Sequence, residues 1–481
     1  METTSDTSEP RSSPPAHRTL TDLWRQAGLL AEALDWADLP GSEPVLPSSF
    51  AVATAAQASL GAAALAAAEL WHLRTGRRQQ VQVPREHAAL ECCGHFTLDG
   101  KVLNPWDKLS GLYPCGADCG EPGWVRIHAN FAHHRDGALA LLGCPTGPAT
   151  ERAAVAQALR RWRAEDFETA AADAGLVVSA ARRFEDWDRH PQAQALAAQP
   201  TVSVQRIDAA DPLPWPVPAP VGRPLQGLRV LDLTRILAGP VAGRTLAAYG
   251  ADVMLVNSPN LPNIDAIAET SRGKLSAHID LHTAAGRDTL QALVREAHVF
   301  LQGYRPGGLA ALGFGPQDLA RLRPGIVVAS LSAYGPVGPW AGRRGFDSLV
   351  QTATGFNHAE AQAAGATEPK AMPMQILDYA AGHLLAFGAQ AALWRQAREG
   401  GSWQVQVSLA GVGHWLRSLG RVPDGLAAQR PAVQPYLVSE ASGFGELVAL
   451  RHAARFSETP ARWLRPSMPP GSHPAVWPMG I

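Results

Sequence analysis

Two long, nearly apolar segments that resemble each other constrain the fold of this chain most strongly. The first is "SFAVATAAQASLGAAALAAAELWHLRTGRRQQVQV", residues 49–83, and the second is "MPMQILDYAAGHLLAFGAQAALWRQAREGGSWQVQVSL", residues 372–409. When their "VQV" triplets are aligned, the segments run at an offset of 324 positions, without a gap, back to Thr54 and Asp378. Each predicts an Ala-rich buried helix, a charged turn containing glycine, and a strand with alternating apolar residues. This period is too long for a solenoid and indicates duplication of a domain.

The two segments differ in one acidic residue at the start of the helix. Asp378 stands where the first segment has Thr54. An Asp at this place is commonly a helix N-cap. Unpaired backbone N–H groups there would also keep a carboxylate ionised and orient it for chemistry. The residues alone leave both interpretations open.

The composition excludes several classes of partner. The 481 residues carry 42 Lys+Arg against 43 Asp+Glu, so no charged field points to nucleic acid or to cationic partners. The polar, Pro- and Ser-rich start predicts a disordered arm over residues 1–20 without a signal peptide. Residues 51–70 approach the length of a membrane span, but their Ala content and Glu69 favour a buried helix instead. We therefore expect a cytoplasmic protein that contacts no membrane.

The cysteines raise the question of a metal site. Five cysteines form an odd number, which favours reduced thiols. "CGADC" at 115–119 is followed by His128, His133 and His134, but no second CxxC or HxxxH completes a set of four ligands. We expect no metal.

The order of predicted elements divides the chain into two kinds of domain. Beyond a Pro-rich stretch come the strands "LRVLDLT", "ADVMLV", "HVFLQGY" and "GIVVASLSAY", separated by helical stretches, which predicts an α/β domain with a parallel sheet. No GxGxxG motif opens its first helix, so NAD and FAD are not assigned. Before the Pro-rich stretch, shorter strands and helices predict an α+β unit. The expected segments are a disordered arm (1–20), a degenerate copy of the Asp378 helix region (21–94), a small α+β domain (95–205), a linker (206–224), a Rossmann-like large domain (225–421), and a closing strand and tail (422–481).

Four motifs resemble one protein family in combination. They are "LRVLDLTRILAGPVAGRTLAAYGADVMLV", "TSRGKLSAHIDL", "LQGYRPGGLAALGF" and "SLSAYGPVGPWAGRRGFDSL", with Asp378 downstream of them. Together they resemble the class III (CaiB/BaiF) CoA-transferases, which include formyl-CoA and carnitine CoA-transferases. "AGLVVSAARRFEDW" and "RHPQAQAL" resemble the smaller domain of that family. The resemblance implies the family III CoA-transferase fold, with the small domain placed unusually before the large one. It leaves open a homodimer or an intrachain pseudo-dimer.

The resemblance also implies a chemistry. Asp378 would attack an acyl-CoA thioester and form an anhydride, then an aspartyl-CoA thioester, before the group passes to a carboxylic acid. Coenzyme A and acyl-CoA are then substrates, and no tightly bound cofactor is implied. Arg305 is expected to pair with phosphate, and Tyr334 to stack or hydrogen-bond near the thioester. Further cations of the large domain are Arg272, Lys274, Arg343 and Arg344. The positions that match CoA contacts are Leu237, Ala238, Ile279, Asp280, Leu281, His282, Gly303, Tyr304, Arg305, Leu331, Ser332, Ala333 and Tyr334.

Two other functions compete with this interpretation. The racemase and epimerase branch of the superfamily would place a His before Asp347, where this chain has Phe346; His383 is a candidate replacement base. A non-catalytic acyl-CoA-binding protein has no need of Asp378. Because Thr54 cannot form an anhydride, we expect one active site per chain.

Overall fold

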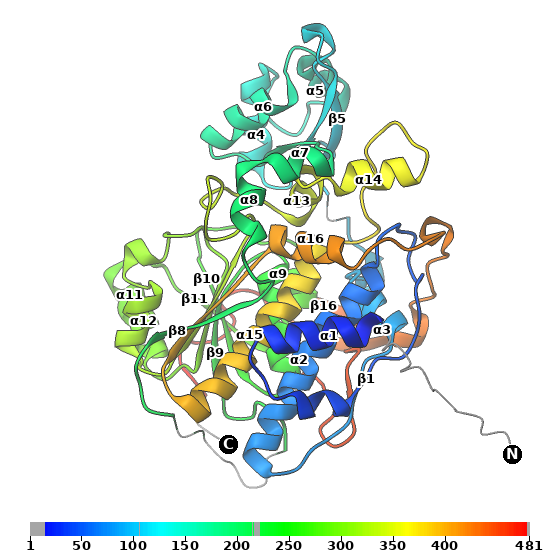
Figure 1. Ribbon diagram of the computed structural model, residues 1–481. Coiled ribbons are helices and arrows are strands. Elements are labelled where there is room, and N and C mark those ends of the chain that lie inside the picture. The colour runs from blue at the N-terminus through cyan, green and yellow to red at the C-terminus, as the bar shows by residue number, and fades with distance from the viewer. Residues whose placement is uncertain (1–14, 105, 214, 216–221, 479–481) are drawn as a thin grey trace, which may run out of the picture.

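A seven-stranded sheet organises the larger part of the molecule (Figure 1). The computed structural model describes residues 15–104, 106–213, 215 and 222–478. In spatial order the sheet runs β11-β10-β9-β12-β13-β14-β8. Its strands are β8 (Ser203–Asp208), β9 (Arg229–Leu233), β10 (Asp252–Asn257), β11 (Lys274–His278), β12 (Val299–Gln302), β13 (Val327–Ser332) and β14 (Ser402–Ser408).

The order of the strands is that of a Rossmann-like sheet. Strands β9 to β14 are all parallel, and only β8 is antiparallel to its neighbour β14. The chain builds β9, β10 and β11 toward one edge and then returns past β9 to build β12, β13 and β14 toward the other. The predicted α/β fold class is confirmed. A topological switch point therefore lies between β9 and β12.

Alternating residues of the central strands enter two separate cores. Val230 and Val299 pack on the face covered by α9 and α15, whereas Leu231 and Phe300 pack on the face covered by α11 and α12. Both faces are covered, which explains the nearly continuous apolar runs of these strands. The helices of this domain are α9 (Ala238–Ala248), α10 (Ile267–Thr270), α11 (Ala284–Val294), α12 (Pro316–Leu322), α13 (Asp347–Ala353), α14 (Phe356–Ala363), α15 (Ile376–Glu399) and α16 (Leu409–Ser418), with a 3-10 turn at Ala310–Leu312.

The two repeated segments form a pair of equivalent helices that pack against each other. Helix α2 (Val52–Thr75) and helix α15 have the same length, and each bound of α15 is that of α2 shifted by 324 positions. The amide of Gln390 donates to the carbonyl of Ala63 at 3.0 Å across the pair. Helix α3 (Arg85–Glu91) begins at the same shift from α16. Within the described part of the chain, neither long helix nor any other is apolar enough to cross a membrane.

A smaller domain stands on one side of the large one, at the top of Figure 1. Its antiparallel sheet has the order β5-β6-β7 and is covered by helices α4 to α6. Helices α7 and α8 then lead into β8 of the large sheet. The bounds are β5 (Gly111–Cys115), β6 (Gly123–Ile127), β7 (Val178–Ala180), α4 (Ala132–Leu142), α5 (Arg152–Leu159), α6 (Ala164–Asp173), α7 (Phe184–Arg189), α8 (Pro191–Ala197) and a 3-10 turn at Ala117–Cys119.

Two small sheets join the start of the chain to its end. One has the order β15-β16-β3-β4 and the other β1-β2-β17. Beyond them the tail runs along the open edge of β11, where the N–H of His473 donates to the carbonyl of Ser276 at 2.8 Å. The remaining elements are α1 (Pro15–Gln26), β1 (Ala37–Asp38), β2 (Val81–Gln82), β3 (Phe96–Leu98), β4 (Lys101–Val102), β15 (Leu437–Ser442), β16 (Gly445–Leu450), β17 (Arg455–Phe456) and 3-10 turns at Ala31–Trp36, Gly425–Ala427 and Gln434–Tyr436.

Three predicted boundaries need correction. Residues 15–20 of the expected arm form the start of α1, because Ala16 and Leu20 are fully buried against the core; residues 1–14 lie outside the described residues. Strands β3 and β4, assigned to the small domain, belong instead to the sheet of β15 and β16, in which β3 pairs with β16 and β4 pairs with β3. Strand β8 includes the last residues assigned to the small domain and the first residues assigned to the linker, because it pairs with β14 and completes the large sheet. Residues 214 and 216–221 of the linker are not among the described residues.

Candidate active site

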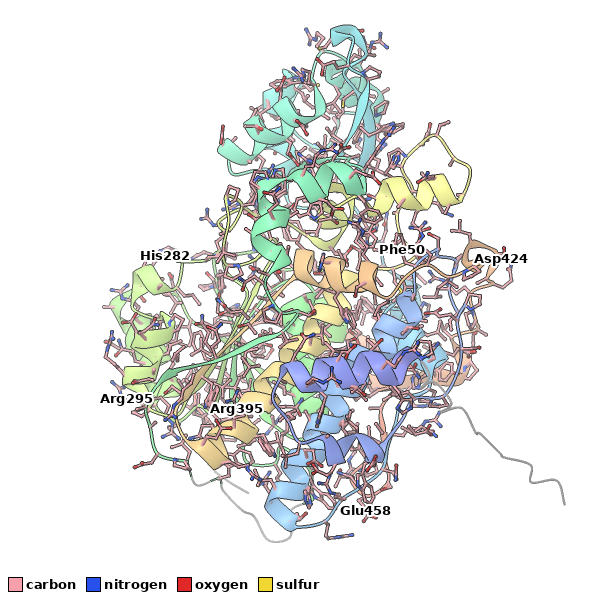
Figure 2. The ribbon with its side chains drawn as sticks, viewed as in Figure 1. Phe50, His282, Arg295, Arg395, Asp424 and Glu458 are labelled. Carbon is pink, nitrogen blue, oxygen red and sulfur yellow. The ribbon has the colours of Figure 1, made fainter. Side chains whose placement is uncertain are left out.

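The positions expected to contact CoA gather at one edge of the large sheet. Leu237 and Ala238 open α9 after β9, residues 279–282 follow β11, residues 303–305 follow β12, and residues 331–334 end β13. Because these strands are parallel, their carboxyl ends meet at the same edge. Figure 2 shows His282 at the end of α11 that faces the small domain and Arg295 at the opposite end.

The turn at the switch point has an unusual backbone. Ile236, between β9 and α9, has a φ of 75°, which is rare for a β-branched residue. Such outliers persist where the surrounding structure over-determines them, and they concentrate at functional sites. Helix α15 packs tightly against this turn, because a Cβ on Gly382 would lie 2.5 Å from the carbonyl oxygen of Ala238. The structure thus presses α15, which carries Asp378, against the start of α9.

Asp378 lies in the first turn of α15 beside a second carboxylate. Its side chain is 9% exposed, and its backbone N–H donates to Oδ2 of Asp347 at 3.0 Å. Asp347 opens α13, is fully buried, and also accepts from the side-chain amide of Gln351. Among the described residues, no donor reaches the carboxyl group of Asp378 itself. The backbone and amide donors therefore stabilise the charge of Asp347 rather than that of Asp378.

Burial and mutual repulsion set the protonation of this pair. Burial, followed by the charge of Asp347, raises the pKa of Asp378 well above its ordinary value. Burial also raises the pKa of Asp347 to about 7, although its hydrogen-bond donors and the nearby Arg126 oppose that shift. The expectation that helix N–H groups keep Asp378 ionised is therefore wrong, because those groups serve Asp347. The pair holds a proton, with Asp378 as its preferred site.

The small domain of the same chain supplies the other wall of this site. Arg126 of β6 is close enough to Asp347 to influence its pKa, and burial lowers the pKa of Arg126 itself to about 10. The ring of His128 stacks on Phe346, with centroids 4.0 Å apart. Sequence reasoning missed Arg126, because nothing local links it to a residue 221 positions away.

Proton-shuttle chemistry of the racemase kind finds little support here. Phe346 occupies the position before Asp347, and its phenyl ring has no ionisable group that could transfer a proton. Burial lowers the pKa of its neighbour His128 to about 3, so that ring is neutral. Burial likewise lowers the pKa of His383 to about 3, and the groups that influence that pKa include Glu91 and Arg244 but not Asp378.

The first copy of the repeat preserves the geometry but replaces the acid. The backbone N–H of Thr54 donates to Oε1 of Glu43 at 2.7 Å, as the N–H of Asp378 donates to Asp347. The hydroxyl of Thr54 donates to the same oxygen at 3.0 Å. The first copy therefore satisfies its carboxylate with two donors, whereas the second places two carboxyl groups side by side.

The structure separates the predicted cations into two groups. Lys274 forms a buried ion pair with Asp232 at 2.8 Å, and Arg272 one with Glu269 at 2.5 Å, so both stabilise the fold and face no substrate. Arg305, in contrast, is exposed and has no carboxylate partner among the described residues.

Of the two predicted cations nearer the small domain, one lies near a carboxylate and the other contacts only a backbone carbonyl. Arg343 lies 3.7 Å from Glu168 of the small domain. Arg344 donates to the carbonyl of Gly175 at 3.1 Å, and the charge of Arg305 lowers its pKa further after burial has done so. Arg305 and Arg344 therefore form a positive patch at the junction of the two domains, with no carboxylate partner in the part of the chain that the structure describes.

Some predicted CoA contacts serve the fold in this structure. Tyr334 is buried, and its hydroxyl lies 3.4 Å from that of Ser179 in the small domain. Ile279 belongs to the core beneath α11. Asp280 accepts from the backbone N–H of His282 at 3.0 Å and shapes the turn after β11.

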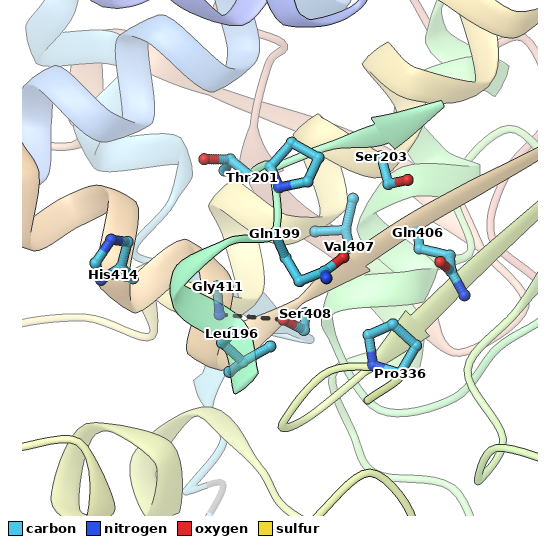
Figure 3. A pocket seen from close by; sticks show the side chains of 11 residues that line it. Leu196, Gln199, Thr201, Ser203, Pro336, Gln406, Val407, Ser408, Gly411 and His414 are labelled. Atoms are coloured by element: carbon cyan, nitrogen blue, oxygen red, sulfur yellow. Dashed lines mark hydrogen bonds between the residues drawn. The ribbon is translucent and has the colours of Figure 1, made fainter. Parts of the chain in front are cut away.

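A shallow hollow lies beside the site rather than over Asp378 (Figure 3). Leu196 of α8, Pro336, Ser408 of β14 and His414 of α16 are among its walls. No group of His, Cys, Asp and Glu among the described residues has the geometry of a metal site, and Cys115 and Cys119 are free thiols.

Comparison with known proteins finds a match to the large domain, which carries Asp378 and Asp347. A family model described as "CoA-transferase family III" matches residues 225–432. This part of the chain is similar to CoA-transferase family III.

Relatives of the chain carry names of the same kind. The chain is 36% identical over 210 residues to a probable fatty acyl-CoA transferase of Mycobacterium tuberculosis, covering 41% of this chain and 53% of that protein. It is 32% identical over 250 residues to the succinate–glutarate CoA-transferase of Agrobacterium fabrum, covering 46% and 62%. A solved CaiB/BaiF family protein of Brucella suis is 25% identical over 47% of this chain and 65% of that one, with a TM-score of 0.35. The chain thus spans little more than half of the length of its relatives.

Proposed function

We propose that this protein is an acyl-CoA:carboxylate CoA-transferase with Asp378 as its nucleophile. The observation that carries the proposal is the Asp378–Asp347 pair, buried between the two domains at the carboxyl edge of the family III sheet. A structural cap would use its carboxylate to accept from the helix N–H groups. Asp378 leaves that role to Asp347 and keeps its own oxygens free of protein donors within the described structure.

The proposed reaction passes through two covalent intermediates. The carboxylate of Asp378 attacks the thioester carbonyl and releases CoA thiolate, which gives an acyl-aspartyl anhydride. The thiolate then attacks the aspartyl carbonyl, which gives aspartyl-CoA and frees the first carboxylic acid. The acceptor carboxylate reverses both steps and leaves as the new thioester. Because anhydride and thioester lie close in energy to the substrate, a carboxylate suits this role.

Asp347 has a defined part in this proposal. Attack requires Asp378 to lose its proton, and Asp347 is the neighbouring group whose pKa, at about 7, lets it exchange a proton at neutral pH. Arg126 limits the negative charge that collects in the pair. The negative CoA phosphates would bind on the Arg305 and Arg344 side of the same edge.

The arrangement also supports an intrachain pseudo-dimer. Helices α2 and α15 pair within one chain, and the small domain that reaches Asp347 precedes the large domain in that chain. We infer that a tandem duplication, trimmed in both copies, produced this order. One chain then carries one complete site, and Thr54 marks the lost one.

Exchange measurements test the proposal. The purified protein is incubated with a panel of acyl-CoAs and carboxylic acids, and new thioesters are detected by mass spectrometry. We expect exchange for at least one pair, with a loss of at least about 1,000-fold in the Asp378→Ala variant. Binding of acyl-CoA without exchange for any pair would favour a non-catalytic binding protein.

A further inference from the structure

One buried side chain of the small domain holds the first part of the segment between β13 and α13. Residues 335–346, "GPVGPWAGRRGF", are called the strap here; they end directly before Asp347. Gln192 of α8 is fully buried. Its amide nitrogen donates to the carbonyls of Tyr334 and Val337, both at 2.7 Å, and its amide oxygen accepts from the backbone N–H of Trp340 at 2.7 Å.

The fit between α8 and the strap leaves no space for other side chains. A Cβ on Gly335 would lie 2.3 Å from Leu196, and one on Gly338 would lie 2.6 Å from the amide oxygen of Gln192. Both glycines have positive φ values, 99° and 88°, which disfavour any replacement. The close approach and the three hydrogen bonds together define one seating of the strap on α8.

The middle of the strap is held by the small domain as well. The ring of Trp340 lies 4.3 Å from that of His190, and the guanidinium of Arg343 lies 4.0 Å above Trp340. Arg343 donates to the backbone carbonyl of Glu168 at 3.1 Å. The strap is therefore fixed to the small domain before the chain enters the large domain at Asp347.

These contacts connect the position of the small domain to the carboxyl pair. Helix α8 leads into β8, so it lies where the small domain joins the large sheet. The hollow of Figure 3 lies along this joint, with Leu196 of α8 on one side and Pro336 of the strap on another. A change in the seating of the strap is transmitted along the chain to Asp347, whose carboxylate holds the N–H of Asp378.

We propose that Gln192 is a positioning residue for the transfer reaction. It fixes the strap on the small domain and so sets the place of Asp347 beside Asp378. This inference rests on the proposed function, because Asp347 matters only where Asp378 reacts. Gln192 itself touches neither substrate nor Asp378.

Two substitutions of Gln192 and a matched control test the proposal. Gln192→Leu keeps the approximate size and removes all three hydrogen bonds. Gln192→Glu keeps an acceptor for the N–H of Trp340 and removes the two donors. The control is Gln194→Leu, because Gln194 lies on the same helix and is exposed. For each protein we would measure kcat, KM for acyl-CoA, the pH profile of kcat, the unfolding midpoint, and hydrogen–deuterium exchange of the strap amides.

The expected result separates positioning from folding. In both Gln192 variants kcat should fall about 10- to 100-fold, as for a small displacement of a reacting group, while KM changes less than about threefold. The pH profile should move toward lower pH, because a displaced Asp347 repels the ionised form of Asp378 less. Strap amides should exchange faster, and Gln194→Leu should match the wild type.

Other outcomes overturn the proposal in distinguishable ways. Faster strap exchange with an unchanged kcat would show that the packing of α13 alone places Asp347. A fall in kcat that follows only the fraction of folded protein, with an unchanged pH profile, would show a purely structural role. A wild-type protein without exchange activity would overturn the proposed function and this inference together.

Discussion

The Asp347–Asp378 pair makes the stability of the protein depend on pH in a way that one substitution should remove. Burial raises the pKa of Asp347 from 3.8 to about 7, so the folded state binds a proton that the unfolded chain releases. Stability from such a group is fully present below the unfolded pKa and is lost as the pH rises through the folded one. Between pH 5 and pH 8 the loss amounts to about 3 kcal/mol, at about 1.4 kcal/mol for each pH unit up to 7.

Asp347→Asn should remove the part of this loss that belongs to Asp347 while keeping the local geometry; burial still raises the pKa of Asp378 in the variant. The amide oxygen still accepts from the N–H of Asp378, but the amide nitrogen then faces the donor of Gln351, which costs about 1 kcal/mol at every pH. We expect near parity with the wild type at pH 5 and a gain of about 3 kcal/mol at pH 8.

Urea unfolding, followed by tryptophan fluorescence from pH 5 to pH 8, measures both proteins. Asp211→Asn, at an exposed position, is the control and should follow the wild type at each pH. A difference between Asp347→Asn and the wild type that stays constant with pH would refute the reasoning. It would mean that Asp347 does not change its protonation between pH 5 and pH 8 in the folded protein.

Three further substitutions probe the repeat, the large sheet and the positive patch. Thr54→Asp places a buried carboxylate against Glu43. Urea unfolding should show that the free energy of unfolding falls by about 2 kcal/mol or more at pH 8 and by less at pH 4. Equal losses at the two pH values would contradict repulsion between the carboxylates. Lys274→Met leaves Asp232 charged and unpaired in the core, and the same assay should show a loss of about 3–5 kcal/mol. Arg305→Gln should raise KM for acyl-CoA about tenfold at low salt with little change in kcat; an unchanged KM would place the phosphates elsewhere.

Local sequence patterns predicted the elements that depend on local signals. The helix pair α2 and α15 follows from apolar runs that end at Gly76 and Gly400, and both helices have the predicted shift. Strands β9, β10, β12 and β13 follow from short apolar runs bounded by turn residues, and β14 follows from alternating apolar residues. Strands β8 and β11 have no such run and were not predicted. Their order in the sheet was not predicted, because apolar runs alone do not say which strands are neighbours.

Long-range pairing explains what sequence reasoning missed. Strand β3 pairs with β16 about 350 positions away, and nothing in "FTL" indicates this partner. The electrostatic effect of Arg126 on Asp347 also depends on contact between residues that are far apart in the sequence. The protonation of Asp378 was predicted wrongly because the helix N–H groups were assigned to the nearest carboxylate in the chain. In space, the carboxylate of Asp347 has the better place to accept them.

The most direct test of Asp378 as nucleophile follows oxygen atoms. The acceptor carboxylate attacks aspartyl-CoA through one of its oxygens, which becomes the bridging oxygen of the mixed anhydride. The CoA thiolate then attacks the carbonyl of the acceptor, and the bridging oxygen leaves with the aspartate. After turnover with an acceptor acid labelled with ¹⁸O in both carboxyl oxygens, digestion and mass spectrometry should find ¹⁸O in the peptide that contains Asp378. Active transfer with the label absent from that peptide, or with the label on another carboxylate of the chain, would contradict the account.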